Sequence, residues 1–529
     1  MFPIPRQTFT SERPDQTPTM GGRGNPEEAQ VRTIQLGRAE YHDKVHACWL
    51  GKNIGGTLGA PFEIRKYVNA LTFYDPVPKR PEANDDLDFQ LVWLKMLEDR
   101  GIDPTLSDFA DYWRRHLSAY PWNEYGFCHR NLERGLLPPI SGCFENYFVD
   151  DMGSPIRSEI WACLAPGDPQ LAASMAWKDA VVDHAGGEGV HGEMFWAAVE
   201  SAAFVVKDPR ILIQIGLAMI PLPSAISRVV REAVWCSDNG IRWAEARERI
   251  ATLHGHFIST NAIPNHGFTI LGWLYGEDYG DSLCKAVNCG YDTDCTGATL
   301  GSVLGIVGGT SSIPEEWKRP IGESIVLHEY TGKCDAPKTT LELTNRVQAI
   351  AERVVAEKCD SVEFGEKTSI PEDILSLLFR SEKARAALRQ DIHAGVVACG
   401  DLVVSFHYHG EPVLRPGIER AFGVSLESRG APVDSGIEVE TPEGWTASTC
   451  REAAGSHRVS VLAHDVADRN LVTIIAKLPD GSRRVSFTLL GPGEARGFGS
   501  GAMVACCWKC GGREGACICP RAAGESAPS

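Results

Sequence analysis

Two short acidic runs, more than 200 residues apart, have the composition of a cation-binding site. Asn84-Asp85-Asp86 opens one predicted helix, with Asp88 following, and Asp292-Thr293-Asp294 precedes Cys295-Thr296 and another predicted helix. A single Asn or Asp is enough to cap a helix, whereas grouped carboxylates raise one another's pKa unless a cation lies between them. Hard ions such as Mg²⁺ bind carboxylate, amide and hydroxyl oxygens. The four aspartates, with Asn84 or Thr296 adding a neutral oxygen, predict a site for two divalent ions.

Glycines recur every four residues in two other segments. They are Gly51, Gly55 and Gly59 in the first segment and Gly297, Gly301, Gly305 and Gly309 in the second. Residues four apart lie on one face of a helix, and each helical glycine costs about 1 kcal/mol relative to alanine. This cost must be offset by close helix packing or by access to something bound nearby. Both explanations are open from the spacing alone.

Helical periodicity extends over residues 37–360, where no alternating strand pattern interrupts it. The run from Leu87 to Leu97 has an apolar stripe of helical spacing that begins at the acidic run. Further helices are predicted for residues 171–182, 193–206, 211–219 and 225–236. We therefore expect an all-α domain over 37–360, followed by a helical linker over 361–394.

The pattern changes after residue 395, where short β-rich runs alternate with turn residues. The turn Pro479-Asp480-Gly481 between two such runs is typical of a β-hairpin. Residues 395–496 are thus predicted to form a small antiparallel β-sandwich. The flanking segments, residues 1–36 and the Cys/Gly-rich 497–529, are predicted to be tails. For the second segment a structural zinc site is an open alternative, with Cys507, Cys510, Cys517 and Cys519 as ligands.

Composition excludes several classes of protein. The 529 residues contain 52 Lys+Arg and 69 Asp+Glu, a formal net charge of −17, which argues against a general nucleic-acid partner because phosphate contacts need basic residues. No run has the length and apolarity of a membrane span or signal peptide, so no membrane partner is expected. The 17 cysteines are scattered through apolar contexts rather than spaced as a disulfide framework. We expect a cytoplasmic protein with reduced thiols.

The motifs, in order, resemble those of the ADP-ribosylglycohydrolases, the family of dinitrogenase-reductase-activating glycohydrolase and the ADP-ribosyl-acceptor hydrolases. The likeness covers residues 40–330 and leaves the β-rich part outside. The matching segments are Gly51-Lys52, Gly59-Ala60-Pro61-Phe62-Glu63, Asn84-Asp85-Asp86, Gly290-Tyr291-Asp292-Thr293-Asp294 and Thr296-Gly297-Ala298.

The resemblance implies an orthogonal all-α bundle that holds two Mg²⁺ ions, with Mn²⁺ as a possible substitute, and cleaves the glycosidic bond of ADP-ribose on a protein side chain. By position, Asp85 and Asp86 match ligands of the first acidic motif, and Asp292 and Asp294 match those of the second. Glu63 matches a catalytic glutamate, with Asp86 as a second catalytic carboxylate. Gly153-Ser154 falls at the pyrophosphate-binding loop, and His184 at a substrate contact.

Two departures bear on the substrate and the metal. Relatives have hydroxyl residues at the positions of Asn84 and Cys295. A thiol is a poor Mg²⁺ ligand. Thr296 could therefore replace Cys295 as a ligand, or a softer ion could occupy the site. The implied partner is an ADP-ribosylated protein or an ADP-ribose-like small molecule. Two alternatives stay open: hydrolysis of another nucleoside or glycoside on the same fold, and a catalytically impaired ADP-ribose-binding protein.

Overall fold

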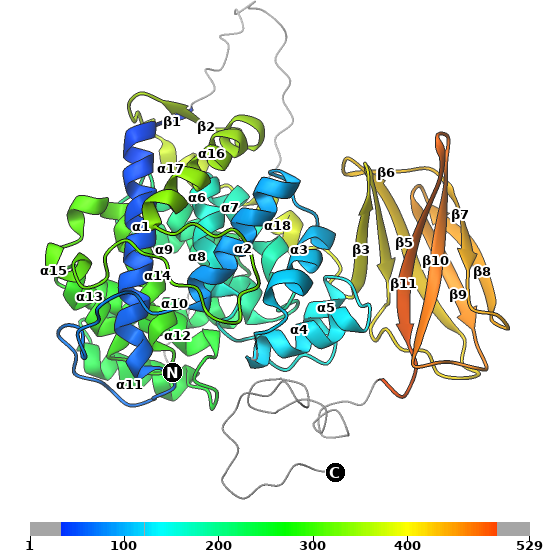
Figure 1. Cartoon of the computed structure of the whole chain (residues 1–529), viewed down its shortest axis with the longest axis horizontal. Coiled ribbons are helices and arrows are strands. Elements are labelled where there is room, and N and C mark those ends of the chain that lie inside the picture. The colour runs from blue at the N-terminus through cyan, green and yellow to red at the C-terminus, as the bar shows by residue number, and fades with distance from the viewer. Residues whose placement is uncertain (1–32, 121, 495–529) are drawn as a thin grey trace, which may run out of the picture. The chain divides into compact units, whose positions relative to one another are not determined.

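The computed structural model describes residues 33–120 and 122–494, and Figure 1 shows a helical domain followed by a β domain. The predicted zinc-binding or unstructured tail over 497–529 lies outside the described residues, as does the predicted N-terminal tail up to residue 32. Nothing in the described part of the chain is a helix long and apolar enough to cross a membrane.

The helical domain is built from short helices in succession. In chain order they are α1 (Arg38–Gly59), η1 (Ala60–Phe62), α2 (Asp85–Arg100), α3 (Leu106–Tyr112), η2 (Trp113–Leu117), α4 (Asn123–Glu133), α5 (Ile140–Cys143), η3 (Pro155–Arg157), α6 (Ser158–Leu164), α7 (Pro169–Ala180), α8 (Glu188–Ala203), α9 (Pro209–Met219), α10 (Ala225–Asp238), α11 (Trp243–His254), α12 (Ala262–Tyr275), α13 (Tyr279–Val287), α14 (Thr293–Gly308), η4 (Thr310–Ser312), α15 (Glu315–Lys318) and α16 (Thr340–Lys358). The sequence-predicted helices correspond to α2, α7, α8, α9 and α10.

Two short parallel strands lie at the two ends of this domain in the chain. Strand β1 (Ile34–Gly37) pairs with β2 (Val362–Gly365), with Ile34 opposite Val362. The segment 361–394 also contains α17 (Ile374–Leu378) and α18 (Glu382–Leu388), and α18 packs on α7. The boundaries at residues 36 and 361 drawn from the sequence therefore fall within or beside paired strands.

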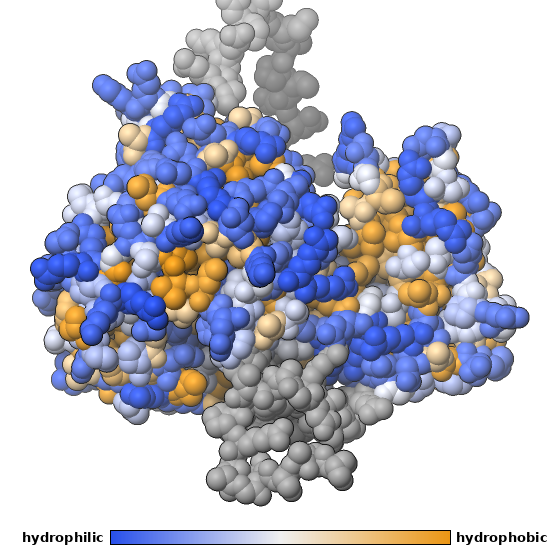
Figure 2. Space-filling model, viewed as in Figure 1, coloured by the Kyte–Doolittle hydropathy of each residue, from blue (hydrophilic) through white to orange (hydrophobic). Residues whose placement is uncertain are grey.

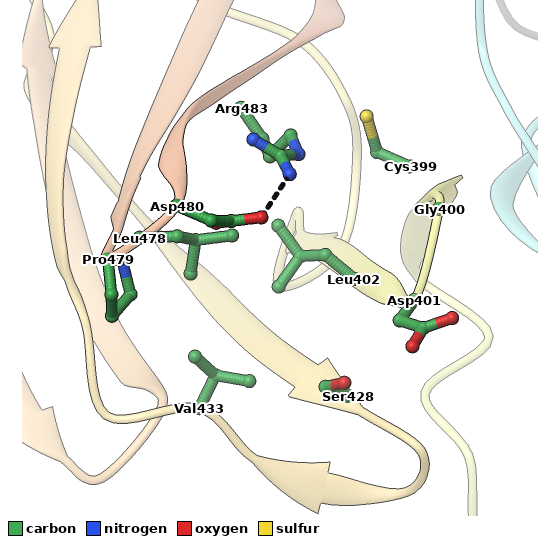
Figure 3. Close-up of a pocket in the computed structure, with 10 residues that line it drawn as sticks. All are labelled: Cys399, Gly400, Asp401, Leu402, Ser428, Val433, Leu478, Pro479, Asp480 and Arg483. Atoms are coloured by element: carbon green, nitrogen blue, oxygen red, sulfur yellow. Dashed lines mark hydrogen bonds and ion pairs between the residues drawn. The ribbon is translucent and has the colours of Figure 1, made fainter.

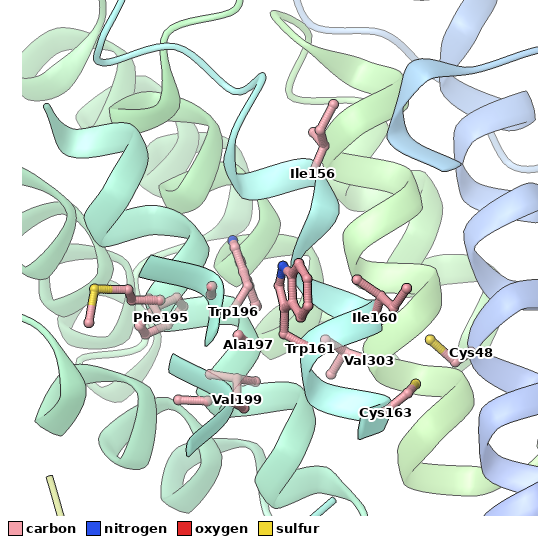
Figure 4. Packing of buried hydrophobic residues seen from close by; sticks show 14 of the residues in the cluster. Cys48, Ile156, Ile160, Trp161, Cys163, Phe195, Trp196, Ala197, Val199 and Val303 are labelled. Atoms are coloured by element: carbon pink, nitrogen blue, oxygen red, sulfur yellow. The ribbon is translucent and has the colours of Figure 1, made fainter. Parts of the chain in front are cut away.

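One continuous apolar core fills the helical domain. Figure 4 shows Ile160 and Trp161 of α6, Trp196 of α8, Val303 of α14 and Cys48 of α1 within it. Trp161 and Trp196 are fully buried, and burying side chains of this size contributes strongly to folding. The described cysteines are all free thiols, and most are buried, as expected for residues that act as small apolar side chains.

Helices α1 and α14 touch through their backbones. A Cβ built on Gly55 would lie 1.9 Å from the carbonyl oxygen of Gly297, and one on Gly51 would lie 2.0 Å from that of Gly301. Similarly, a Cβ on Gly59 would lie 2.1 Å from the carbonyl oxygen of Thr293. Direct helix packing, which leaves no room for a side chain, therefore explains these glycines. Gly309 is an exception to the predicted stripe, because it lies after the end of α14 with φ of 73°.

The β domain consists of two antiparallel sheets. Its strands are β3 (Ala394–Cys399), β4 (Leu402–His407), β5 (Arg420–Ser428), β6 (Ala431–Pro432), β7 (Gly436–Glu440), β8 (Thr446–Ala453), β9 (Ser456–Leu462), β10 (Arg469–Leu478) and β11 (Gly481–Leu490). One sheet has the order β3-β4-β5-β9-β8, with β6 on β5, and the other has the order β11-β10-β7. Since Leu478 pairs with Gly481, the predicted hairpin is confirmed. The description all-α thus applies to the helical domain and not to the whole chain.

The apolar sides of both sheets share a core that includes Phe406, Phe422 and Phe487. At the turns β3–β4 and β10–β11, a pocket of about 510 Å³ is lined by apolar Leu402 and Leu478 and by an ion pair between Asp480 and Arg483 at 2.6 Å (Figure 3). The face of the molecule seen in Figure 2 is mainly hydrophilic, with scattered apolar patches, in keeping with its acidic composition.

The α1–α14 contact predicts the effect of Gly55→Ala. Alanine gains about 1 kcal/mol of helix propensity, but its Cβ would overlap the Gly297 backbone. We expect the free energy of unfolding to fall by about 2 kcal/mol, as in overpacked cores, measured by urea denaturation followed by far-UV circular dichroism.

The control is Gly436→Ala at the start of β7, where an added Cβ would have no heavy atom within 4 Å. This variant should unfold close to the wild-type midpoint. Equal midpoints for the two variants would contradict the proposed role of the backbone contact.

Candidate metal centre

The first acidic run forms the N-terminus of α2. Asn84 is the N-cap, and its Oδ1 accepts a hydrogen bond from the backbone N–H of Asp86 at 2.9 Å. Asp85, Asp86 and Asp88 therefore all lie in the first helical turn, where the helix dipole favours negative charge. Because Asn84 caps the helix, the carboxylate of Asp86 is not needed for that role.

The second acidic run forms the N-terminus of α14, which packs against the end of α1. Thr293 Oγ1 donates to the carbonyl oxygen of Gly59 at 2.8 Å. Asp292 occupies the N-cap position but makes no side-chain capping hydrogen bond. The backbone before it turns sharply, since Gly290 and Tyr291 both have positive φ, 74° and 72°. This turn directs Asp292 and Asp294 toward the first acidic run.

Glu63 follows η1 and is held next to the second run by backbone hydrogen bonds. The N–H of Ile64 donates to the carbonyl of Tyr291 at 2.9 Å, and the N–H of Tyr291 donates to that of Arg65 at 2.7 Å. Ile64 has φ of 72°, a conformation that a β-branched residue adopts only when its surroundings impose it. The partly exposed Glu63 is thereby brought to the buried Asp292.

Two groups of possible ligand atoms result, and they share Asp294. One consists of Asp86, Asp294 and Cys295, and the other of Glu63, Asp292 and Asp294. In each group the ligand atoms lie within 4.8 Å of one another. Asn84 Nδ2 also donates to Asp294 Oδ2 at 3.4 Å, which links the two helix N-termini. The two candidate ligand sets therefore lie next to each other and share one carboxylate.

Several of these carboxylate oxygens are buried without a hydrogen-bond partner among the described residues. They are both oxygens of Asp292, Oδ1 of Asp294 and Oδ2 of Asp86, and Asp292 is only 1% exposed. Burial and the neighbouring carboxylates raise the pKa of Asp292 and, by burial first, that of Asp294. Burial and Asp294 raise the pKa of Asp85 to about 6. A buried ionised oxygen without a partner is costly, so these residues fit a bound divalent cation.

Lys52 provides a positive charge below the site. Its Nζ lies 2.7 Å from Glu159 Oε1 and 3.8 Å from Asp86 Oδ2, and it donates to the carbonyl of Ile156 at 2.9 Å. Burial disfavours the charged form of Lys52. The negative charges of Glu159 and Asp86 together have the larger effect and raise the pKa of Lys52. In the sequence, Lys52 stands out only as part of a motif, and Glu159 is not indicated at all. A lysine in a glycine-rich apolar helix was the signal that could have found this pair.

The predicted pyrophosphate loop and His184 belong to a second buried network. Ser154 Oγ donates to Glu193 Oε2 at 2.5 Å, and Arg157 binds both oxygens of Asp183, at 2.8 and 3.0 Å. His184 Nδ1 lies 3.0 Å from Asp183 Oδ2. Gly153, Ser154 and His184 are buried, and Arg157 donates to the carbonyl of Gly153 at 2.9 Å. Their predicted contacts with substrate stay predictions.

Two other polar residues near the site have structural partners. Thr296 Oγ1 donates to the carbonyl of Thr293 at 3.2 Å, and it is Cys295 that joins a ligand group. Asp88 Oδ2 accepts from Tyr120 at 2.9 Å and from Thr331 at 2.7 Å. Asp88 therefore ties the segment after α15 to α2. Sequence analysis also missed Tyr125, which donates to Asp85 Oδ2 at 3.0 Å.

Fold and site together define a helical protein with a carboxylate-rich candidate metal centre, and comparison with known proteins identifies its family. The ADP-ribosylglycohydrolase family model matches residues 37–359, so the chain belongs to that family. The chain is 23% identical over 303 residues to an uncharacterized protein of Archaeoglobus fulgidus, an alignment that covers 55% of this chain and 95% of the relative. A solved structure, an ADP-ribosylglycohydrolase-related protein complex, is 19% identical, with 59% of this chain and 97% of that chain covered and a TM-score of 0.40.

Family membership supports a glycohydrolase-like function for the chain. It confirms the resemblance inferred from the sequence, and the β domain lies outside the matched residues. The family is typically metal-dependent, in agreement with the two ligand groups.

Asp292, whose carboxylate oxygens have no hydrogen-bond partner among the described residues, is expected to destabilise the metal-free protein, so its replacement should increase stability. Because Asn carries no charge, Asp292→Asn should raise the melting temperature of the metal-free protein by a few degrees. The same variant should lose most of the stabilisation that Mn²⁺ gives to the wild type. Differential scanning fluorimetry with EDTA and with MnCl₂ measures both effects.

Asp168→Asn is the matched control, since Asp168 is also a buried aspartate at a helix N-terminus but accepts a hydrogen bond from the N–H of Leu171 at 3.2 Å. It should not raise the metal-free melting temperature and should keep the Mn²⁺ response. A lower metal-free melting temperature for Asp292→Asn would contradict the cation-site assignment.

A pH dependence follows from the raised pKa of Asp85. In the folded, metal-free protein its pKa is about 6, against 3.8 as the ordinary value. Between these values the folded state binds more protons than the unfolded state, so this contribution to stability is present below pH 3.8 and is lost as pH rises through 6. Mn²⁺ binds the deprotonated form, so the rise in melting temperature on adding Mn²⁺ should grow from pH 4 to pH 7. An Mn²⁺ effect that is constant over this range, or shrinks, would contradict a cation bound at these carboxylates.

Proposed function

We propose that this chain is a divalent-metal-dependent glycohydrolase that cleaves the glycosidic bond of an ADP-ribosyl or related ribosyl substrate. The observation that carries the proposal is the group of buried carboxylate oxygens at the facing N-termini of α2 and α14 that have no hydrogen-bond partner among the described residues, with Glu63 beside them. Purely structural carboxylates would be paired or hydrogen-bonded. Membership of the ADP-ribosylglycohydrolase family supports the substrate class.

Two ions would be held by Asp86, Asp292, Asp294 and Glu63. The group of Glu63, Asp292 and Asp294 offers only oxygen ligands and would take Mg²⁺ or Mn²⁺. Asp85 adds negative charge from the first turn of α2. When bound, such ions supply positive charge that orients two adjacent ribose hydroxyls and polarises the sugar. A sugar fixed in this way presents its anomeric carbon to water in one orientation, which lowers the entropic part of the barrier.

Glu63 is the group best placed to move a proton. It is the one carboxylate of the two ligand groups that is partly exposed, and the hydrogen bonds of Ile64 and Tyr291 hold its backbone at Asp292. We assign it the general base that activates water, or the general acid that assists the leaving group. The buried carboxylates, Asp86 among them, stabilise the positive charge that develops on the ring as the bond to the aglycone breaks.

The loop at Gly153 is proposed to bind the pyrophosphate through backbone N–H groups, because the Ser154 hydroxyl is engaged by Glu193. His184 is proposed to support this loop from within the protein. It lies beside Asp183, which binds Arg157, and Arg157 in turn donates to the carbonyl of Gly153.

Glu63→Gln tests the proposed chemistry. The glutamine keeps the shape of the side chain but cannot accept or donate the reacting proton, so kcat should fall by about 10²–10⁴-fold while ADP-ribose binding is retained. The assay is release of ADP-ribose from peptides that carry ADP-ribosyl-arginine or ADP-ribosyl-serine, with Mg²⁺ or Mn²⁺. Glu315→Gln, at a side chain 74% exposed, is the control and should keep wild-type turnover.

The outcomes separate the alternatives. Metal-dependent binding of ADP-ribose by calorimetry, without turnover of either peptide, would indicate a binding protein instead of a hydrolase. Failure of ADP-ribose to bind in the presence of metal would point to another glycoside as substrate. Wild-type turnover by Glu63→Gln would remove Glu63 from the reaction.

A further inference from the structure

The two ligand groups differ in chemistry, because one contains sulfur and the other only oxygen. We infer that Asp86, Asp294 and Cys295 form a thiolate-containing metal site that selects a softer divalent ion such as Zn²⁺ or Co²⁺ over Mg²⁺. The neighbouring group of Glu63, Asp292 and Asp294 takes a hard ion. This inference rests on the proposed function, since it concerns the same centre.

The position of the thiol supports a direct metal contact. Cys295 Sγ donates to Asp86 Oδ1 at 3.4 Å, and both belong to one group whose ligand atoms lie within 4.8 Å of one another. Cys295 is 7% exposed and lies in the first turn of α14. Its side chain therefore bridges the α2 and α14 N-termini at the point where the carboxylates meet.

A second observation comes from the oxygens around this thiol. Asp86 Oδ2 and Asp294 Oδ1 have no hydrogen-bond partner among the described residues, and these aspartates are 0% and 8% exposed. The thiol donates to Asp86 Oδ1. The group thus offers Asp294 Oδ1, Asp86 Oδ2, which faces the Lys52 ammonium at 3.8 Å, and a sulfur atom, and these form a mixed ligand set.

The charge balance favours a thiolate as the third ligand. The Lys52 ammonium, 3.8 Å from Asp86 Oδ2, offsets one of the two carboxylates and weakens the attraction of this group for a hard cation. A thiolate restores a second negative charge next to a divalent ion. When it binds, the S–H bond breaks, a sulfur–metal bond forms and the proton passes to solvent, with no change in oxidation state.

The chemistry of sulfur sets the selectivity. Soft thiolate ligands favour Zn²⁺ and related ions, whereas Mg²⁺ requires oxygen ligands. A hydroxyl residue at position 295 would leave this group with oxygen ligands alone. Cys295 therefore makes the two halves of the centre unlike, although they share Asp294.

Cobalt substitution tests the inference. The metal-free full-length protein is titrated with Co²⁺ under anaerobic conditions, and the near-ultraviolet thiolate-to-cobalt charge-transfer band is recorded. We expect the band in the wild type and its loss in Cys295→Thr, which keeps a ligand of similar size. Cys295→Thr should also keep the Mn²⁺-induced rise in melting temperature, because the oxygen-only group is intact.

Other thiols are controlled by two variants. Cys284→Ser changes a buried cysteine of α13 outside both groups, and a variant with serine at the cysteines of the C-terminal tail, Cys506, Cys507, Cys510, Cys517 and Cys519, removes that source of thiolate. Both should keep the band. A band that persists at full intensity in Cys295→Thr would overturn the inference.

A measurement on protein that keeps Cys295 makes the test independent of how Cys295→Thr folds. X-ray absorption of the tail variant loaded with one equivalent of Zn²⁺ should show a sulfur scatterer at about 2.3 Å, and a shell of oxygen or nitrogen alone would overturn the inference. Neither spectrum depends on turnover. Absence of hydrolysis with every metal would refute the proposed function while leaving the assigned sulfur ligand in place.

Discussion

The backbone contact between α1 and α14 is the constraint on which the candidate site depends. Gly51, Gly55 and Gly59 lie against the carbonyl groups of Gly301, Gly297 and Thr293, so the end of α1 is fixed at the beginning of α14. Glu63 follows the end of α1, and Asp292 precedes α14. The contact therefore determines how close the glutamate comes to the second acidic run, before any hydrogen bond in the loop is considered.

A buried network places the first acidic run on the same centre. Lys52 lies on α1, between the glycines that contact α14, and reaches Asp86 and Glu159. Gln90 of α2 donates to Glu159 Oε2 at 2.8 Å. Helices α1, α2 and α6 are thereby joined by charged and polar groups beneath the carboxylates. Since a buried charge without a partner is strongly destabilising, this network has few alternative arrangements, and it fixes the helices that carry the ligands.

Much of this arrangement could be predicted from local patterns in the sequence. The start of α2 at Asp85, the hairpin at Pro479-Asp480 and the glycine-spaced helices each follow from a few adjacent residues. The partners of Lys52 and Asp88 could not be predicted, because Glu159 and Thr331 are distant in sequence and have no spacing that indicates the contact. For the same reason the sequence did not show that the Ser154 hydroxyl is turned toward Glu193, or that Cys295 and not Thr296 faces Asp86.

We propose that carboxylates from two distant segments enclose divalent cations. An anomalous difference map from crystals soaked in MnCl₂, collected near the manganese absorption edge, examines this most directly. The account predicts anomalous density between the N-termini of α2 and α14, within bonding distance of Asp294. A well-ordered map with no peak between residues 85–86 and 292–294 would contradict it.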